Sequence, residues 1–335
     1  MGEERRPTIY DVGEDAGVAA STVSRAFARP GRVSAATHAK VMASAKRLGY
    51  RTDIPAQQQR DERSHRLGIE LADITNPYFA EVVSGMQEAA QAHGYMLLLL
   101  DSTEDEDRER EVLQRSIDVV DGIVLAGSRL ADVTLGQLSK QVPLVVLNRR
   151  VAGLDSVTPD YAHGMVQVME HLAERGARRI VYTAGPVNSW SDAERWRTAR
   201  IAAQHRDLVL HRVGPFPPTT RGGEEAYASL REDLPDAVVA YNDLLATGIL
   251  VSALRDGVKV PDELSVIGHD DIPLARLIGG AGLTTVASPK RAQGRAAVER
   301  LVRHVENPSS VTGPVEGSLP VRLIPRGSTG RRRSR

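Results

Sequence analysis

The feature that most constrains the fold is a long series of short apolar runs, each followed by an amphipathic segment. The runs begin at Arg66 and read RLGIELA, YMLLLLD, DGIVLA, PLVVLN, RRIVYTAG, DAVVAYND, ELSVIGHDD and LTTVASP. Strand-then-helix alternation at this spacing predicts parallel sheets joined by right-handed crossovers, and such sheets bind ligands at the carboxyl ends of their strands. We therefore predict a two-lobed α/β body over residues 66–327.

Polar side chains end several of these runs. A cluster of amides and carboxylates suits a polyhydroxylated ligand, because a carboxylate accepts from two adjacent hydroxyls and an amide both donates and accepts. The candidates are Asp73, Asn148, Asn242 with Asp243, and Asp270 with Asp271. Any of these residues could instead cap the next helix. We expect capping for Asp243 and Asp271, and ligand contact for Asn242 and Asp270.

Aromatic residues are placed in loops that follow predicted strands. Their rings could cover the apolar face of a sugar ring, with Asn76 contributing an amide beside them. They are Tyr78 and Phe79 of the NPYF segment, Trp190 and Phe216.

The first 52 residues are basic, although the net charge of the whole chain is zero. They hold nine Lys or Arg against five Asp or Glu, an excess of four positive charges. A small basic segment on a neutral body predicts a polyanionic partner for that segment alone. A solvated basic face is the alternative that charge by itself leaves open.

We predict a DNA-binding domain of three short helices over residues 1–52. Thr8 can cap the first helix, because its hydroxyl can accept an unpaired N–H of the first turn, and Gly17 ends that helix. A second helix follows from about Ala20 to Phe27, and Ser34 begins a third. Two short helices separated by a glycine turn form a helix-turn-helix, whose second helix fits the DNA major groove.

The outward side chains of the second helix would contact DNA, together with Thr8 at the start of the first helix. Arg25 can pair bidentately with guanine, a contact worth about 1–3 kcal/mol of discrimination, and Ser21 can bond to several bases. Ala20 offers only a methyl contact, whereas Thr22 and Ser24 suit phosphates. A helix-turn-helix pattern that serves only as a structural corner is the alternative at this stage.

Longer motifs resemble the lactose-repressor (LacI/GalR) family of bacterial regulators. The segment IYDVGEDAGVAASTVSRAF is similar to that family's DNA-binding head. The segments DITNPYF, AGP, NSWSDAERWR, AYNDLLATG, PDELSVIGHDD and LTTV resemble its effector-binding core, a fold related to periplasmic sugar-binding proteins. Three features depart from the family's pattern or vary within it: Gly13 replaces the usual alanine, Ala19 replaces a capping serine, and Ala20 and Ser21 occupy the operator-choosing positions. The resemblance leaves the operator sequence open.

The resemblance also implies an effector site. Its residues would be Asn148, Arg195, Asn242 and Asp270, with Asp160 as a further pocket acid. Arg197 is the alternative to Arg195, since the family's R-x-x-G is R-x-x-T here. The implied function is a repressor of carbohydrate-utilisation genes whose operator affinity changes on binding a sugar-like effector between the lobes. The alternatives are co-repression by a nucleobase and sugar binding without a regulatory role.

Residues 53–65 would link the two parts. In the resembling family this segment is a hinge that folds on operator DNA and wedges a leucine into the minor groove. The wedge position holds Gln59 here, which cannot unstack bases as an apolar side chain does, so we expect a DNA-contacting hinge with weak kinking. A plain tether is the alternative. Residues 328–335 would form a basic disordered tail.

Several classes of function are excluded or disfavoured. The absence of cysteine excludes disulfides and thiolate catalysis, and the chain has no HExxH, G-x-S-x-G or P-loop motif. We expect no catalysis, metal or cofactor, and we interpret the acidic residues 102–111 as the first turns of a surface helix. No stretch approaches the roughly 20 apolar residues of a membrane helix, so we expect a cytoplasmic protein. No leucine heptad follows the last strand, which predicts a homodimer that binds double-stranded operator DNA.

Overall fold

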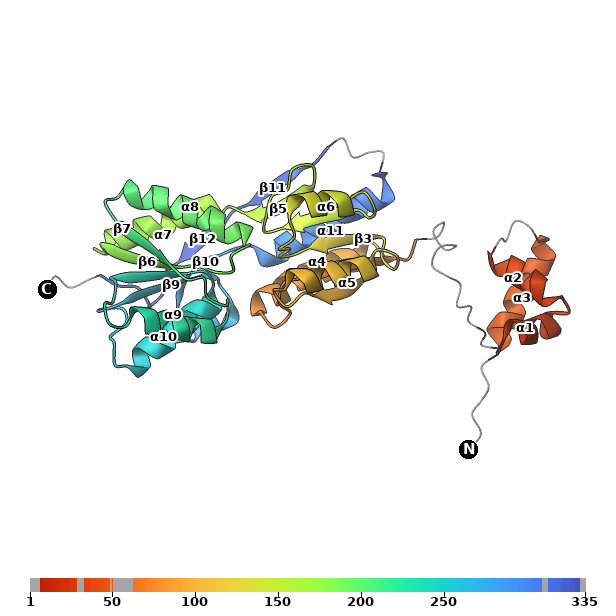
Figure 1. Ribbon diagram of the computed structural model, residues 1–335, viewed down its shortest axis with the longest axis horizontal. Helices are drawn as coiled ribbons and strands as arrows, with labels where there is room; N and C mark the ends of the chain where they lie inside the picture. Colours follow the sequence, from red (N-terminus) through yellow and green to blue (C-terminus); the bar gives the residue numbers. More distant parts are fainter. Residues whose placement is uncertain (1–6, 29–32, 49, 51–62, 309–312, 332–335) are drawn as a thin grey trace, which may run out of the picture. The chain divides into compact units, whose positions relative to one another are not determined.

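The computed structural model describes residues 7–28, 33–48, 50, 63–308 and 313–331, and divides them between two units. The units comprise residues 1–64 and residues 65–335 (Figure 1). Most of the predicted hinge, including Gln59, lies outside the described residues, as do the last four residues. No helix in the described ranges is long and apolar enough to cross a membrane.

The first unit is the predicted three-helix head. Its helices are α1 (Ile9–Ala16), α2 (Ala20–Ala28) and α3 (Ala35–Leu48). Thr8 caps α1 in a capping box with Asp11, and Gly17 ends it with a φ of 64°, a left-handed angle that glycine adopts at little cost. The core of the head is formed by buried side chains from all of these helices: Val12, Val23, Ala26, Val41 and Ala45.

The second unit begins with a lobe built on a parallel sheet, which we call the N-lobe. Strand order is β11-β5-β4-β3-β1-β2. The strands are β1 (Arg66–Leu71), β2 (Met96–Asp101), β3 (Gly122–Leu125), β4 (Leu144–Leu147), β5 (Asp155–Pro159) and β11 (Glu316–Leu319). The helices of this lobe are α4 (Pro77–Ala92), α5 (Glu106–Ser116), α6 (Asp132–Leu138) and α11 (Lys290–Glu306).

The other lobe, the C-lobe, repeats this plan. Strand order is β12-β10-β9-β8-β6-β7, parallel except that β12 runs antiparallel to β10. The strands are β6 (Arg179–Thr183), β7 (Val209–Val213), β8 (Ala237–Ala240), β9 (Ser265–Asp270), β10 (Thr284–Ala287) and β12 (Arg322–Ile324). The helical elements are α7 (Tyr161–Glu174), α8 (Trp190–Gln204), α9 (Thr220–Leu230), α10 (Asp243–Arg255) and the 3₁₀ helix η3 (Pro273–Arg276).

All of the predicted apolar runs form strands, which confirms the α/β interpretation, but the sequence pattern missed β5, β7, β11 and β12. Strands β7 and β11 lie at sheet edges, and all of their side chains are exposed or half-buried. Strand β5 is buried but reads DSVTP, so it has no continuous apolar run. The missed strands therefore lacked the signal that buried parallel strands normally carry.

The chain passes from one lobe to the other after β5, after β10 and after β11. A proline lies within or directly before each of these crossings: Pro159 ends β5, Pro289 follows β10 and Pro320 follows β11. Because proline fixes φ, the connecting backbone is less free to bend than an ordinary loop. Residues at or just beyond the carboxyl ends of strands from both sheets line one cavity between the lobes.

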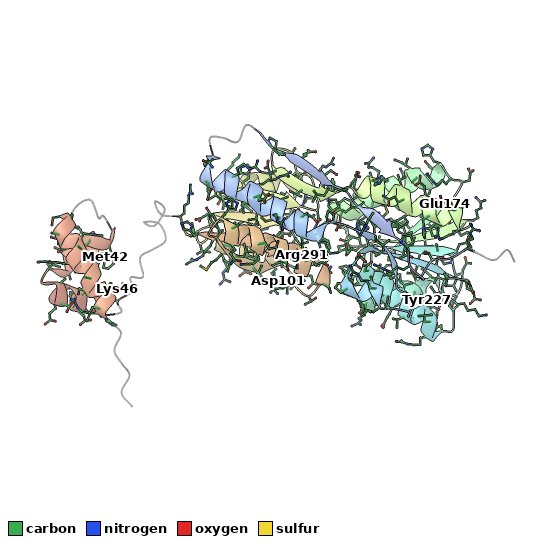
Figure 2. The ribbon with its side chains drawn as sticks, turned by 180° about the vertical axis from the view of Figure 1, so that it is seen from behind. Met42, Lys46, Asp101, Glu174, Tyr227 and Arg291 are labelled. Carbon is green, nitrogen blue, oxygen red and sulfur yellow. The ribbon has the colours of Figure 1, made fainter. Side chains whose placement is uncertain are left out.

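Glycines allow close helix packing in each lobe. A Cβ at Gly294 of α11 would lie 2.0 Å from the carbonyl oxygen of Val82 in α4, and one at Gly248 of α10 would lie 2.0 Å from that of Thr220 in α9. On the surface of the first pair, Arg291 and Arg295 each bond to Glu88 at 2.6 Å (Figure 2 labels Arg291). The close approach places the first turn of α11 beside the interlobe cavity.

The predicted tail boundary at residue 328 is wrong. Ser328 is buried and bonds through Oγ to the carbonyl oxygen of Val266, and Thr329 is buried against His171 and Thr284. These residues are small and polar, so composition alone suggested a tail. Their hydroxyls are instead satisfied by distant parts of the C-lobe.

Candidate functional sites: a helix-turn-helix face and an interlobe cleft

Helix α2 presents the expected side chains on its outer face. Ser21, Ser24 and Arg25 are exposed, and Ala20 and Thr22 are half-buried. The hydroxyl of Thr8 is occupied by Asp11, so its observed role is that of a helix cap. Helix α2 thus buries one side in the head core and leaves a small polar and basic side free.

Arg25 and Ser21 are bonded to each other along α2. Arg25 donates from Nε to the carbonyl oxygen of Ser21 at 3.0 Å and from Nη2 to its hydroxyl at 3.3 Å. A guanidinium carries five N–H groups, so this contact leaves donors for another acceptor. The two side chains therefore form one polar unit on the outer face of α2.

The second site is a cavity between the lobes, with an internal volume of about 60 Å³. Its polar and aromatic lining comes from the N-lobe with Asn76, Tyr78, Phe79, Glu104, Arg129 and Asn148, and from the C-lobe with Tyr161, Ser191, Arg195, Tyr241, Asn242, His269 and Asp270, with Ser288 after β10.

Asn148 is a hydrogen-bonding centre at the base of the cleft. Its Oδ1 accepts from the hydroxyls of Tyr78 at 3.0 Å and Tyr161 at 3.2 Å, and from Nε2 of Gln293 at 2.7 Å. Burial raises the pKa of both tyrosines, which keeps their hydroxyls protonated as donors. With Oδ1 saturated, the amide nitrogen of Asn148 is the group that remains for a ligand in the described structure.

Arg195 is buried on the opposite wall. It donates from Nε to the carbonyl oxygen of Ser191 at 3.1 Å and from Nη1 to that of Tyr241 at 2.6 Å, and its guanidinium carbon lies 4.6 Å from the centre of the Tyr241 ring. Arg197 is exposed and pairs with Glu194. The structure therefore brings Arg195, and not Arg197, to the cavity.

Asp270 ends β9 with a φ of 115°. No described residue donates a hydrogen bond to its carboxylate, whereas Lys290 donates to its backbone carbonyl at 2.6 Å. Burial raises the pKa of Asp270 to about 7, although Arg195 and Lys290 act in the opposite direction. Both carboxyl oxygens are thus available to ligand hydroxyls.

Asn242 both caps a helix and lines the cleft. Its Oδ1 accepts from the backbone N–H of Leu245 at 2.8 Å, and its Nδ2 donates to the carbonyl oxygen of Pro218 at 3.0 Å. The neighbouring Asp243 is buried and accepts from Thr285 Oγ1 and a backbone N–H. A Cβ at position 268 would lie 2.1 Å from Oδ1 of Asp243, which explains the glycine of the GHDD segment.

Comparisons with known proteins agree with this two-part geometry. Residues 8–53 match the family described as bacterial regulatory proteins, lacI family, and residues 169–329 match the periplasmic binding protein-like domain. The HTH-type transcriptional repressor CytR of Escherichia coli K12 is 30% identical over 98% of this chain and 97% of its own length. The chain belongs to the lacI family. It is therefore a DNA-binding transcriptional regulator.

Other members of the lacI family align over similar lengths. The regulator GalS of Salmonella typhimurium is 32% identical over 87% of this chain and 88% of its own length. The transcriptional regulator CelR, solved as a complex with cellobiose, is 26% identical with a TM-score of 0.71 and covers 96% of this chain and all of its own. The lac repressor dimer, at 23% identity and a TM-score of 0.72 over 97% of this chain and all of its own, shows the same fold.

The structure of this lacI-family regulator separates the sequence-predicted effector residues into two groups. The cavity is lined by Asn76, Tyr78, Phe79, Asn148, Arg195, Asn242 and Asp270. Asp73, Asp160, Trp190 and Phe216 are not in the lining. Asp73 bonds to Thr75 and Asp160 caps α7. Trp190 begins α8, and Phe216 packs on the hydrophobic core.

Sequence reasoning missed several lining residues. The polar and aromatic ones are Glu104, Arg129, Tyr161, Ser191, Tyr241, His269 and Ser288. Arg129 and Tyr241 follow strands, so the rule that located Asn148 could have found them. His269 is buried in the cleft wall. Its burial and the nearby Arg195 and Lys290 lower the pKa of its imidazole well below the usual range, which leaves the ring neutral.

The interpretation of residues 102–111 as a solvated helix face is wrong in part. Helix α5 begins there, but Glu109 is fully buried and accepts from the backbone N–H of Arg129 at 2.8 Å. Glu70, inside β1, is also fully buried and accepts from Ser102 Oγ at 2.8 Å. One oxygen of each carboxyl group has no partner among the described residues. Burial and then repulsion by Glu109 raise the pKa of Glu70 to about 8.

The buried acid makes the free energy of unfolding depend on pH. Between the ordinary value of 4.5 and about 8, folded Glu70 keeps a proton that the unfolded chain releases, so stability falls as pH rises through this window. We expect Glu70→Gln to flatten this fall and to raise stability at pH 8 by about 1–3 kcal/mol, because a buried neutral amide does not have to take up a proton on folding. Denaturant titrations from pH 5 to pH 8 measure the free energy of unfolding of the wild type and of the variant. Glu106→Gln on the surface of α5 is the control, and parallel pH profiles for wild type and Glu70→Gln would contradict the assignment.

Proposed function

We propose that this lacI-family regulator represses carbohydrate-utilisation genes and that a small sugar-like effector, bound between the lobes, changes its affinity for operator DNA. The observation that carries the proposal is a polar cleft between two lobes in a chain that also bears a helix-turn-helix. Operator DNA lies in the cytoplasm, so the regulator acts there. The proposal assigns the chain no catalytic step, metal or cofactor.

The DNA site is the outer face of α2. Arg25 supplies the strongest base-specific donor, Ser21 a hydroxyl beside it, and Thr22 and Ser24 hydroxyls for phosphates. Ala19 has no side-chain oxygen with which to cap α2. Only its backbone carbonyl accepts hydrogen bonds there, from the N–H groups of Thr22 and Val23. The recognition helix is therefore held in place chiefly by its packing in the head core.

Loss of the Arg25 guanidinium should remove sequence discrimination. We expect Arg25→Ala to lower the preference for operator over unrelated DNA about 10- to 100-fold, as the loss of one bidentate base contact of about 1–3 kcal/mol implies. Genomic fragments retained by the pure protein supply the operator, and gel-shift titrations measure the preference. Lys46→Ala on α3 (Figure 2) removes the same charge from a different helix. Unchanged selectivity in Arg25→Ala would refute this DNA site.

The unsatisfied groups of the cleft suit a polyol. Donors remain on the amide nitrogen of Asn148 and on the guanidinium of Arg195, and acceptors remain on Asp270. A sugar hydroxyl can donate to the carboxylate while it accepts from a donor, so neighbouring hydroxyls can satisfy all of these groups together. CelR was solved with cellobiose and a related regulator of Enterococcus faecium with ribose.

The carboxylate of Asp270 should be needed for ligand binding and not for DNA binding. A sugar at one hundred times its Kd stabilises a folded protein by about 2.7 kcal/mol, which appears as a rise in the melting temperature. We expect Asp270→Ala to lose this rise, whereas Asp73→Ala, outside the cavity, should keep it. The sugars processed by genes adjacent to the retained fragments form the panel.

The melting assay and the operator gel shift together distinguish the alternatives. A rise caused by a nucleobase and by no sugar would favour a co-repressed regulator. A rise caused by a sugar that leaves operator affinity unchanged would favour a sugar-binding protein without a regulatory role.

The regulator should act as a homodimer, with one head on each half-site. Each lobe exposes apolar side chains, which monomeric surfaces seldom gather in patches. In the N-lobe they lie on the edge strand β2, where Met96 is 63% exposed and Leu98 and Leu99 are also exposed; in the C-lobe they include Leu254 and Leu277. An unpaired apolar edge strand is a surface that a second copy would cover.

Charges on the β2 edge should therefore dissociate the dimer. We expect the double variant Met96→Asp, Leu99→Asp to sediment as a monomer at concentrations at which the wild type is dimeric. Its binding to a two-half-site operator should weaken at least tenfold. Val133→Asp, an exposed apolar position on α6, is the control. A double variant that sediments like the wild type would exclude β2 from the interface.

A further inference from the structure

The buried lysine and arginine side chains that the structure describes in the two lobes form ion pairs, except at Arg195. Lys290 pairs with Glu81, and Arg149 pairs with Asp132. Arg195 is 4% exposed, and no described residue forms an ion pair with it. A charge removed from water is costly unless a group of opposite charge compensates it. The cleft wall therefore holds one positive charge that has no acid bound to it.

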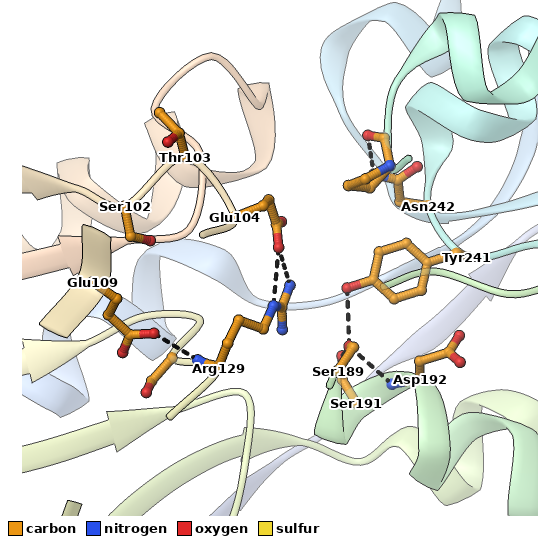
Figure 3. Close-up of polar contacts among 12 residues, drawn as sticks. Ser102, Thr103, Glu104, Glu109, Arg129, Ser189, Ser191, Asp192, Tyr241 and Asn242 are labelled. Atoms are coloured by element: carbon orange, nitrogen blue, oxygen red, sulfur yellow. Dashed lines mark hydrogen bonds and ion pairs between the residues drawn. The ribbon is translucent and has the colours of Figure 1, made fainter. Parts of the chain in front are cut away.

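The acids on α8 and on the facing wall of the cleft are bound to other arginines. They form these ion pairs: Glu194 with Arg197, Asp192 with Arg212, and Glu104 with Arg129. Figure 3 shows Glu104 bonded to two nitrogens of Arg129, at 2.9 Å and 2.6 Å, on the wall that faces Tyr241. The second guanidinium of the lining is thus neutralised by its own partner, and that of Arg195 is not.

Asp270 is the other acid in the described lining of the cavity. It forms no ion pair with Arg195 in the structure. Burial raises its pKa to about 7, although Arg195 and Lys290 act in the opposite direction. Near neutral pH roughly half of the Asp270 carboxyl groups therefore carry a proton. Asp270 offsets the charge of Arg195 only in part.

The guanidinium of Arg195 keeps the donors that a carboxylate requires. Its Nε bonds to the carbonyl oxygen of Ser191, its Nη1 to that of Tyr241, and its Nη2 to the hydroxyl of Ser191 at 3.4 Å. A guanidinium carries five N–H groups, so one N–H remains on each terminal nitrogen. A carboxylate can accept two parallel hydrogen bonds from such a pair.

We propose that the ligand of the cleft is a sugar acid whose carboxylate pairs with Arg195. One unpaired buried charge calls for one negative charge, which a carboxylate supplies, whereas a phosphate group carries about 1.5 to 2. The hydroxyls of the same ligand meet Asn148 and Asp270. Its role as effector rests on the proposed function, whereas its negative charge rests on Arg195. A neutral sugar that bridges Arg195 and Asp270 through its hydroxyls is the competing occupant.

Matched sugars test the charge of the ligand. Full-length protein is titrated with glucose, galactose and mannose, with the corresponding uronates and aldonates, and with the corresponding 6-phosphates, and the rise in melting temperature gives each Kd. We expect at least one sugar acid to bind about tenfold or more tightly than its neutral parent, as hydrogen bonds to a charged group imply. The proposal is overturned when no sugar acid binds more tightly than its parent, or when a 6-phosphate binds more tightly than the matching acids.

Substitutions on α8 locate the charge that the ligand meets. Arg195→Met removes the guanidinium, and we expect it to bind the acid no more tightly than the neutral parent. Arg195→Lys keeps the charge without the paired N–H groups and should retain part of the preference. Arg197→Met is the matched control, since Arg197 lies on the same helix, is exposed and does not line the cavity. A full preference for the acid in Arg195→Met would contradict the assignment.

Melting curves without ligand establish that each variant is folded, and the wild-type panel decides the class of ligand even where Arg195→Met does not fold. Operator gel shifts with the same sugars separate this inference from the proposed function. A neutral sugar that binds more tightly than its acids and changes operator affinity would refute the carboxylate and leave the proposed function standing. A sugar acid that binds through Arg195 without changing operator affinity would do the reverse.

Discussion

The crossings between the lobes are the constraint on which the site depends. Because the chain returns from each lobe through short segments at Pro159, Pro289 and Pro320, residues at the carboxyl ends of strands from both sheets line a single cleft. Parallel sheets bind ligands at these ends, since the loops there carry side chains that no strand pairing restricts. Because the two sheets face each other, a ligand can contact both walls of the cleft. Its binding can therefore be coupled to closure of the lobes.

The cleft contains charged side chains whose burial lowers the free energy of unfolding unless they are hydrogen-bonded. Arg195 and Arg129 are largely buried, and each is held by several hydrogen bonds, as a buried charge requires. Glu70 and Glu109 each have one carboxyl oxygen with no hydrogen-bond partner among the residues that the structure describes, so these buried acids of the N-lobe are only partly satisfied there. Such groups reduce stability, but Glu109 holds the backbone of Arg129 while Glu104 holds its guanidinium, which apolar side chains could not do.

Much of the fold could be predicted from sequence because its signals are local. The buried strands are continuous apolar runs, and Thr8 and Gly17 mark the ends of α1 through capping and backbone angle. Strands β7 and β11 could not be predicted in this way, since strands whose side chains are all exposed or half-buried carry little apolar signal. Ser328 and Thr329 resembled a tail because their partners, Val266 and Thr284, are distant in sequence.

The site was predictable where position after a strand decides it, and at Arg195, where the family resemblance marked the residue. Asn148, Asn242 and Asp270 end strands, and they line the cleft as the pattern suggested. The sequence could not say that Asp160 would bond to its own helix and Asp270 to no described side chain, because the same residue type serves as a cap or as a free acceptor. Glu104 and Glu109 resembled a solvated face, yet Arg129, distant in sequence, draws both inward.

The sequence by itself therefore determined the helix-turn-helix, the alternating body and the strand ends where a ligand would be met, since each depends on neighbours within a few residues. Only the tertiary structure decided which polar groups face the cleft and which are satisfied elsewhere. Those outcomes depend on partners more than twenty residues away, such as Glu104 for Arg129 and Gln293 for Asn148. A hydrogen bond of that kind exists only after the sheets and their crossings have brought its two ends together.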